Sequence, residues 1–184
     1  MTAGRLIARL TIGGLFVGHG TQKLFGWFGG QGPGGTAQTM EKLELRPGRR
    51  HALAAGISET AGGALVALGA LTPAAAAMLS GTMFTAIRKV HFQKGPWNTG
   101  GGYEYNLTLI AALAALVEVG PGSPSLDRRL GIERTGSAWA LASVAAGLAG
   151  AQLAIEAGRR GAEVEAEREH QPERARETRV PVAA

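Results

Sequence analysis

The chain has 184 residues, a formal net charge of +5 and no cysteine, and 45% of its residues are hydrophobic. This length suits one domain, and the lack of cysteine excludes disulfides, thiolate catalysis and cysteine metal sites. The basic residues flank long apolar runs, a pattern typical of membrane proteins. We therefore expect a lipid bilayer, and no nucleic acid, as the partner of this chain.

The first apolar run, residues 6–28, is long enough to cross a hydrocarbon layer about 30 Å thick. No small-x-small cleavage site follows it, so we expect a transmembrane helix rather than a signal peptide. Its second half carries three polar residues that share one helix face: His19, Gln22 and Lys23. Residues 36–43, capped by Thr36, predict a short helix lying flat on the membrane interface.

Two further apolar runs predict an antiparallel pair of membrane helices. The second predicted span covers residues 51–71 and is interrupted by Glu59. The third covers residues 73–92. The connection at Thr72-Pro73 is very short and places proline in the first turn of the third helix, so the two helices must be antiparallel neighbours.

The rest of the chain predicts two more helices and a charged tail. Residues 103–120 form the fourth predicted span, and residues 137–157 form an additional apolar helix that is long enough to cross the membrane. Residues 158–184 mix Arg and Glu, which predicts a partly disordered tail. The predicted fold is an all-α, integral membrane, antiparallel helix bundle with four core transmembrane helices and a fifth apolar helix.

Antiparallel threading brings the polar residues to one end of this bundle, called side B, where the first predicted span ends and the second begins. The opposite end, side A, is expected to hold almost no buried ionisable group. Intramembrane charges are costly unless they are paired or wet, so Glu59 needs a cation, and Arg88 is preferred over Lys23 because guanidinium binds carboxylate in bidentate fashion. The candidate residues of a polar binding pocket are His19, Gln22, Lys23, Glu59, Arg88, His91 and Glu104.

Each candidate also has a structural interpretation. An internal ion pair at Glu59 could serve only helix packing, and Lys23 and His91 could simply reach toward the membrane interface. Haem ligation between His19 and His91 is disfavoured because the two lie at depths that differ by about one turn. The widely separated histidines predict no metal site.

Several short motifs occur together between residues 5 and 130. They are the run Gly18–Gly30, Glu59 with Gly62-Gly63, Leu71-Thr72-Pro73, Val90-His91 with Lys94-Gly95, Gly101–Asn106, and Ser125-Leu126-Asp127. In these motifs the segment 5–130 resembles the DoxX family of membrane proteins. Residues 137–157 and the tail 158–184 extend beyond the usual length of that family. A four-span protein has both chain ends on one side of the membrane, and a fifth span would place them on opposite sides.

The resemblance implies a four-helix membrane bundle, and some DoxX relatives are subunits of thiosulfate:quinone oxidoreductases. We therefore expect a multi-pass cell-membrane subunit of an oxidoreductase system, with quinone as its cofactor and soluble or membrane oxidoreductase subunits as partners. The alternative is a non-enzymatic anchor or binding subunit whose polar cluster is purely structural. A small-solute carrier is disfavoured because the polar residues lie away from the bilayer midplane. The sequence leaves open whether the chain is itself an enzyme.

The distribution of positive charge predicts the orientation. Cations near membrane ends mark the cytoplasmic side, and the two side-B connections carry more of them than side A does. Arg5 and Arg9, before and within the first span, argue for the reverse orientation. On balance we expect a cytoplasmic side B, an external N-terminus and a cytoplasmic C-terminal tail.

Overall fold

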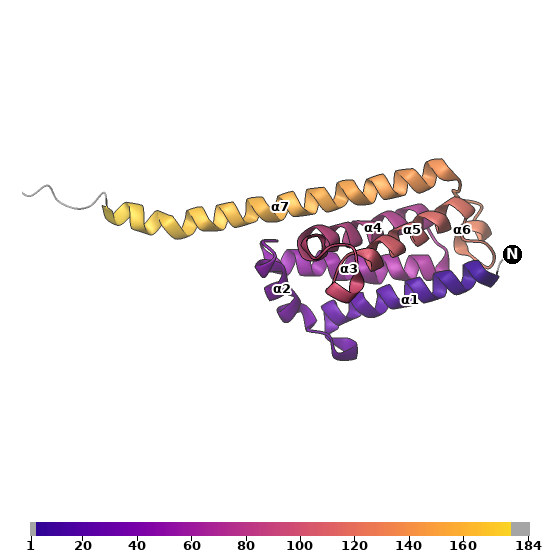
Figure 1. Cartoon of the computed structure of the whole chain (residues 1–184), viewed down its shortest axis with the longest axis horizontal. Coiled ribbons are helices and arrows are strands. Elements are labelled where there is room, and N and C mark those ends of the chain that lie inside the picture. The colour runs from indigo at the N-terminus through magenta and orange to yellow at the C-terminus, as the bar shows by residue number, and fades with distance from the viewer. Residues whose placement is uncertain (1–2, 178–184) are drawn as a thin grey trace, which may run out of the picture.

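The computed structural model describes residues 3–177, with side chains described as far as residue 167. The described part is all-helical and contains no strand, as predicted (Figure 1). The longer helices are α1 (Ala3–Phe25), α3 (Gly48–Leu68), α4 (Thr72–Ala86), α5 (Glu104–Val119) and α7 (Ser137–Glu177). The shorter ones are α2 (Gly32–Lys42), α6 (Leu126–Arg129), the π-helix Ile87–His91 and the 3-10 turns Trp27–Gly29, Phe92–Lys94 and Asn98–Gly100.

The long helices form one bundle around an apolar core. Helix α1 packs along α3, α3 packs on α4, and α4 packs on both α5 and α7. The core between them includes Phe16, Val66, Leu79 and Leu113, which are almost fully buried. The α2 end of the bundle is side B, and the end near the N-terminus and α6 is side A (Figure 1).

Helices α1 and α3 approach closely because glycine occupies their contact face. A Cβ atom at Gly20 would lie 2.2 Å from Thr60 Oγ1, and a Cβ atom at Gly13 would lie 2.5 Å from the carbonyl oxygen of Gly63. Both distances are far shorter than any side chain tolerates, so these positions require glycine for this packing. The neighbouring Gly18 faces open space and carries no such requirement.

The connection between α3 and α4 is as tight as the sequence predicts. Helix α3 ends at Leu68, Gly69 adopts a left-handed conformation with φ 62°, and α4 begins at Thr72. Leu71 is also left-handed, with φ 45°, a conformation that costs energy for a residue with a branched side chain. The two helices therefore lie side by side in opposite directions.

The short helix near side B differs from the prediction at its start. Helix α2 begins at Gly32, with Pro33 in its first turn, and Thr36 is buried inside the helix rather than capping it. Proline is favoured in the first turn because its missing N–H would have no partner there. The prediction of a Thr36 cap is therefore wrong by about one helical turn.

Helix α7 runs along the bundle from side A to side B. Near side A, Ser137 Oγ donates a hydrogen bond to Glu118 Oε1 at 2.6 Å. At the other end, the Arg46 N–H donates to the carbonyl oxygen of Gly158 at 3.3 Å, and Arg46 pairs with Glu165 at 2.8 Å. The helix continues past this point to Glu177, so the first part of the tail is helical, and residues 178–184 lie outside the described residues.

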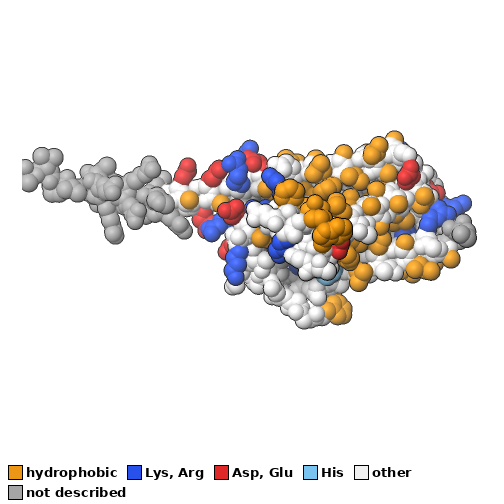
Figure 2. Space-filling view, in the orientation of Figure 1, with side chains coloured by type: hydrophobic (Ala, Val, Ile, Leu, Met, Phe, Trp, Pro, Cys, Tyr) orange, Lys and Arg blue, Asp and Glu red, His pale blue; other side chains and the backbone are white. Residues whose placement is uncertain are grey.

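Large hydrophobic side chains also cover the outside of the bundle. Ile7, Leu10, Ile57, Leu141 and Leu153 are all more than half exposed. Figure 2 shows hydrophobic side chains spread over the middle of one face, with charged side chains mainly toward its two ends. Exposed apolar surface on this scale is expected where lipid replaces water.

By length and apolar composition, one helix of the described part qualifies as a membrane span: Ser137–Glu167 within α7. This segment contains the additional apolar helix that the sequence analysis placed at residues 137–157.

Candidate functional site

An ion pair between α1 and α3 lies at the centre of the polar residues. Lys23 Nζ is 2.5 Å from Glu59 Oε2, and the two side chains are 26% and 7% exposed, respectively. Lys23 Nζ also lies 3.4 Å from the carbonyl oxygen of His19, one turn earlier on α1. The prediction that Glu59 faces the interior beside a cation is therefore confirmed.

The preference for Arg88 as that cation is wrong. Arg88 lies on the exposed surface of the π-helix Ile87–His91, whereas the neighbouring Lys89 and His91 are partly buried. A π-helix has a wider turn than an α-helix, so the residues after Ala86 are rotated relative to a regular continuation of α4. Lys89 instead approaches Glu44, at 3.4 Å.

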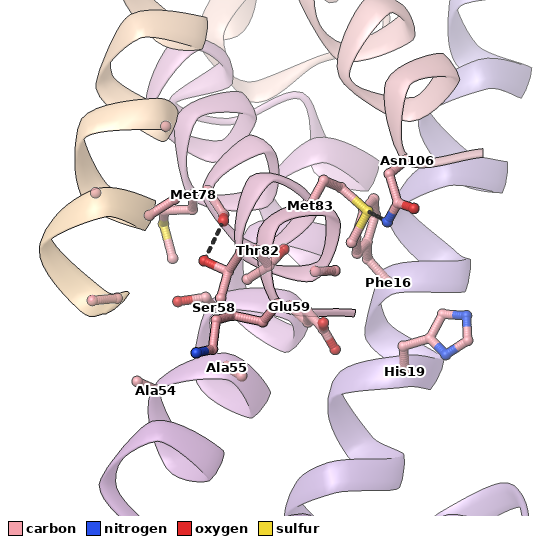
Figure 3. Close-up of a pocket in the computed structure, with 18 of the residues that line it drawn as sticks. Phe16, His19, Ala54, Ala55, Ser58, Glu59, Met78, Thr82, Met83 and Asn106 are labelled. Atoms are coloured by element: carbon pink, nitrogen blue, oxygen red, sulfur yellow. Dashed lines mark hydrogen bonds between the residues drawn. The ribbon is translucent and has the colours of Figure 1, made fainter. Parts of the chain in front are cut away.

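The ion pair borders a large, partly open cavity that all five long helices and α2 line. Its volume is about 660 Å³, and its surface is mostly apolar. Figure 3 shows Ser58 and Glu59 on α3, facing Thr82 and Met83 on α4, with His19 on α1 to one side. Alanine and glycine residues of α7 form the opposite wall. The cavity therefore combines one buried ion pair with a predominantly hydrocarbon surface.

Two of the candidate residues hold the turn that follows α1. His19 Nδ1 lies 3.1 Å from Gln22 Oε1, and Gln22 Nε2 donates to the carbonyl oxygen of Phe28 at 3.3 Å. The first of these bonds requires the proton on Nδ1 of His19, which leaves Nε2 as an acceptor when the ring is neutral. His19 lines the cavity, but Gln22 does not.

Two other candidates organise the loop between the π-helix and α5. His91 Nδ1 lies 2.6 Å from the carbonyl oxygen of Gly101, and Glu104 Oε1 accepts a hydrogen bond from the Asn98 N–H at 2.9 Å. His91 also lines the cavity, whereas Glu104 and Arg88 do not. The cavity thus brings together four of the seven predicted residues: His19, Lys23, Glu59 and His91.

Comparison with known proteins agrees with the motifs. Residues 4–92 match the DoxX family. The chain is a DoxX family protein. DoxX is a membrane family, so this chain is a membrane protein. No curated protein and no solved structure matches it.

The match places the Lys23–Glu59 pair and His91 inside the family segment of this DoxX protein. Helices α5 and α7, which complete the cavity, follow that segment. The cavity is therefore built partly by the matched segment and partly by helices that the match does not cover.

A second polar cluster of the DoxX protein, at side A, was missed by the sequence analysis. Asp127 of α6 is 2% exposed, and its carboxylate accepts hydrogen bonds from the Leu71 N–H at 2.7 Å, the Thr72 N–H at 2.9 Å and the Thr72 hydroxyl at 2.6 Å. It thereby caps the N-terminus of α4, where a negative charge is favourable.

Arg9 lies in the same cluster and is 1% exposed. Its Nη2 atom donates to the carbonyl oxygen of Pro124. The expectation that side A holds almost no buried ionisable group is therefore wrong. The signal was present in the motifs, because Leu71-Thr72-Pro73 and Ser125-Leu126-Asp127 both belong to the DoxX resemblance and here bind each other.

Proposed function

We propose that this DoxX protein is a multi-pass cell-membrane subunit of an oxidoreductase system and that its large cavity binds the head group of a quinone. The observation that carries the proposal is the cavity of about 660 Å³, which is mostly apolar and contains the Lys23–Glu59 ion pair. Binding sites for small molecules combine this size and apolar character with a few polar groups that fix orientation.

The multi-pass arrangement is supported by where the apolar side chains lie. Helices α1, α3 and α5 each expose leucine or isoleucine on the outside, and polar residues lower the average hydropathy of α1 and α3 alone among the three. In α3 the charged Glu59 is buried inside the bundle and does not meet lipid. If α1, α3, α4 and α5 cross the membrane together with α7, then Lys23 and Glu59 both lie inside one membrane bundle.

The chemistry of the lining residues fits a quinone. The carbonyl oxygens of a quinone head accept hydrogen bonds, and the Lys23 ammonium has a third N–H besides those directed at Glu59 and the His19 carbonyl oxygen. Glu59 keeps that ammonium charged and oriented, and the apolar walls suit an isoprenoid tail. A bound quinone would supply the two-electron chemistry, and His19 could hold a proton at Nε2.

The electron donor would lie outside this chain. Because the chain has no cysteine, it cannot itself run thiol–disulfide exchange. A soluble or membrane oxidoreductase subunit that docks on this protein would complete the system.

A specific observation favours a second function, that of a non-enzymatic anchor. The Lys23–Glu59 pair joins α1 to α3, and three of the remaining candidates bond to the chain itself: Gln22, His91 and Glu104. On this proposal the polar cluster fixes helix packing and loop structure, and the membrane bundle holds a partner protein at the bilayer.

Purification from native membranes followed by quinone analysis separates the two proposals. We expect quinone to co-purify with the wild-type protein, and a short-chain quinone analogue to bind about tenfold more weakly to Lys23→Gln, because one charge-assisted hydrogen bond is lost. His19→Ala should bind more weakly as well. Lys42→Gln is the control, since Lys42 is exposed on α2 and does not line the cavity.

Two outcomes would contradict the quinone proposal. One is the absence of quinone together with a stoichiometric partner protein, which the anchor function predicts. The other is equal affinity for the analogue in Lys23→Gln, His19→Ala and Lys42→Gln when all three remain folded.

A further inference from the structure

A second cavity, of about 270 Å³, lies at side A of the bundle, far from the Lys23–Glu59 pair. It is formed by the first turns of α1, the end of α3 and the segment that contains α6. Its polar lining residues are Arg9, Ser125 and Arg129, and its apolar ones include Leu68 and Leu126. The cavity is thus basic on one part of its surface and apolar on another.

Arg9 is the unusual member of this cavity. Although it is 1% exposed, its Nε and Nη1 atoms have no hydrogen-bond partner among the described residues. Only Nη2 is used, in the bond to the carbonyl oxygen of Pro124. Buried charged donors without partners are costly, so a ligand that supplies acceptor oxygens would stabilise this arrangement.

Asp127 attracts Arg9 electrostatically but offsets only one of the positive charges in and beside the cavity. The carboxylate of Asp127 already accepts three hydrogen bonds from the start of α4 and makes none to Arg9. Arg129 adds a second positive charge to the lining, and Arg5 lies close by, with its Nη1 donating to the carbonyl oxygen of Val119 at 2.8 Å. The excess positive charge favours an anion, and arginine pairs especially well with phosphate.

The depth and the apolar surroundings favour a lipid. Arg9 lies six residues after Ala3, which is about 9 Å along the helix from the start of α1 at 1.5 Å per residue. Leu68 and Leu126, which line the cavity, are 55% and 38% exposed on the outside of the bundle. We propose that this cavity binds the phosphate group of an anionic phospholipid through Arg9 and Arg129, with the acyl chains along Leu68 and Leu126.

Lipid retention in a defined bilayer tests this site. The full chain is reconstituted into phosphatidylcholine nanodiscs with a minor fraction of phosphatidylglycerol, and the lipids retained after release are counted by native mass spectrometry. We expect the wild-type protein to retain phosphatidylglycerol preferentially, because the choline cation is repelled by the arginines. Arg129→Gln should retain about tenfold less, since a charge-assisted hydrogen bond is lost.

Arg128→Gln is the matched control, because Arg128 lies beside Arg129 in α6, is exposed and does not line the cavity. Equal retention by Arg128→Gln and Arg129→Gln would overturn the proposal. Arg9→Gln should also lose the lipid if its helical content is unchanged; if it fails to fold, the comparison of the two α6 variants still decides. Complete displacement of phosphatidylglycerol by millimolar inorganic phosphate would overturn the lipid part and leave a free anion as the ligand.

Discussion

The Lys23–Glu59 pair predicts an asymmetry between the two single substitutions that remove it. Glu59 is only 7% exposed and its carboxylate has one partner among the described residues, so removing Lys23 leaves a buried charge with no compensation. Lys23 is 26% exposed, and its long side chain can turn toward water or head groups when Glu59 is removed. Loss of the lysine should therefore destabilise the protein more than loss of the glutamate.

The size of the effect follows from burial. Lys23→Met should lower the free energy of unfolding by about 3 kcal/mol, the low end for breaking a buried pair. Glu59→Leu should cost about 1.5 kcal/mol, because the remaining ammonium can regain part of its hydration. The double variant leaves no unpaired charge and should lie within about 1 kcal/mol of the wild type, which implies a coupling of at least about 3.5 kcal/mol.

Unfolding in mixed detergent micelles, followed by the helical circular dichroism signal, measures these free energies. Lys42→Met, on the exposed surface of α2, is the control and should change stability by less than about 0.5 kcal/mol. Two results would refute the reasoning. The first is simple additivity of the two single substitutions within about 0.5 kcal/mol. The second is a larger cost for Glu59→Leu than for Lys23→Met.

Three further predictions test other parts of the structure. Asp127→Ala should cost about 2 kcal/mol in the same unfolding assay, because the start of α4 loses its capping carboxylate; a neutral effect would contradict that role. Gly20→Ala should destabilise by about 1–3 kcal/mol because its Cβ would meet Thr60, whereas Gly18→Ala faces open space and should be neutral or stabilising; equal effects would contradict the close packing. Reporter fusions after Arg46 and after Arg160 should both report the cytoplasm. Opposite sides would mean that α7 does not cross, and two external reports would reverse the orientation.

The sequence was sufficient to predict that His19, Lys23, Glu59 and His91 lie at a similar depth in the bundle. Antiparallel threading requires only helix order and length, and both follow from the apolar runs and the tight connection at Thr72. Helix order and length could not show whether Lys23 or Arg88 pairs with Glu59. It depends on the rotation of the last turns of α4, and the π-helix Ile87–His91 changes that rotation without a clear pattern in the sequence.

The side-A cluster shows a different limit. Hydropathy alone predicts that an arginine near the start of a span lies at the membrane surface. Arg9 is instead buried in the protein, with only 1% of its surface exposed. The contact between Asp127 and the start of α4 joins residues 55 positions apart, so local capping rules do not find it. Glu104 was likewise placed near the pocket by depth alone, whereas its carboxylate faces the backbone of its own loop at Asn98.

The length of α7 has a mechanical consequence. Twelve residues of continuous helix separate Glu165, which pairs with Arg46, from Glu177, a rise of about 18 Å at 1.5 Å per residue. Figure 1 shows this part of α7 projecting beyond the rest of the bundle on side B. A helix is a stiff spacer, so a protein bound at its far end would be held at a fixed distance from the bundle. Shortening this spacer by whole turns would draw such a partner toward the bundle in steps of about 5.4 Å while keeping the same helix face in register.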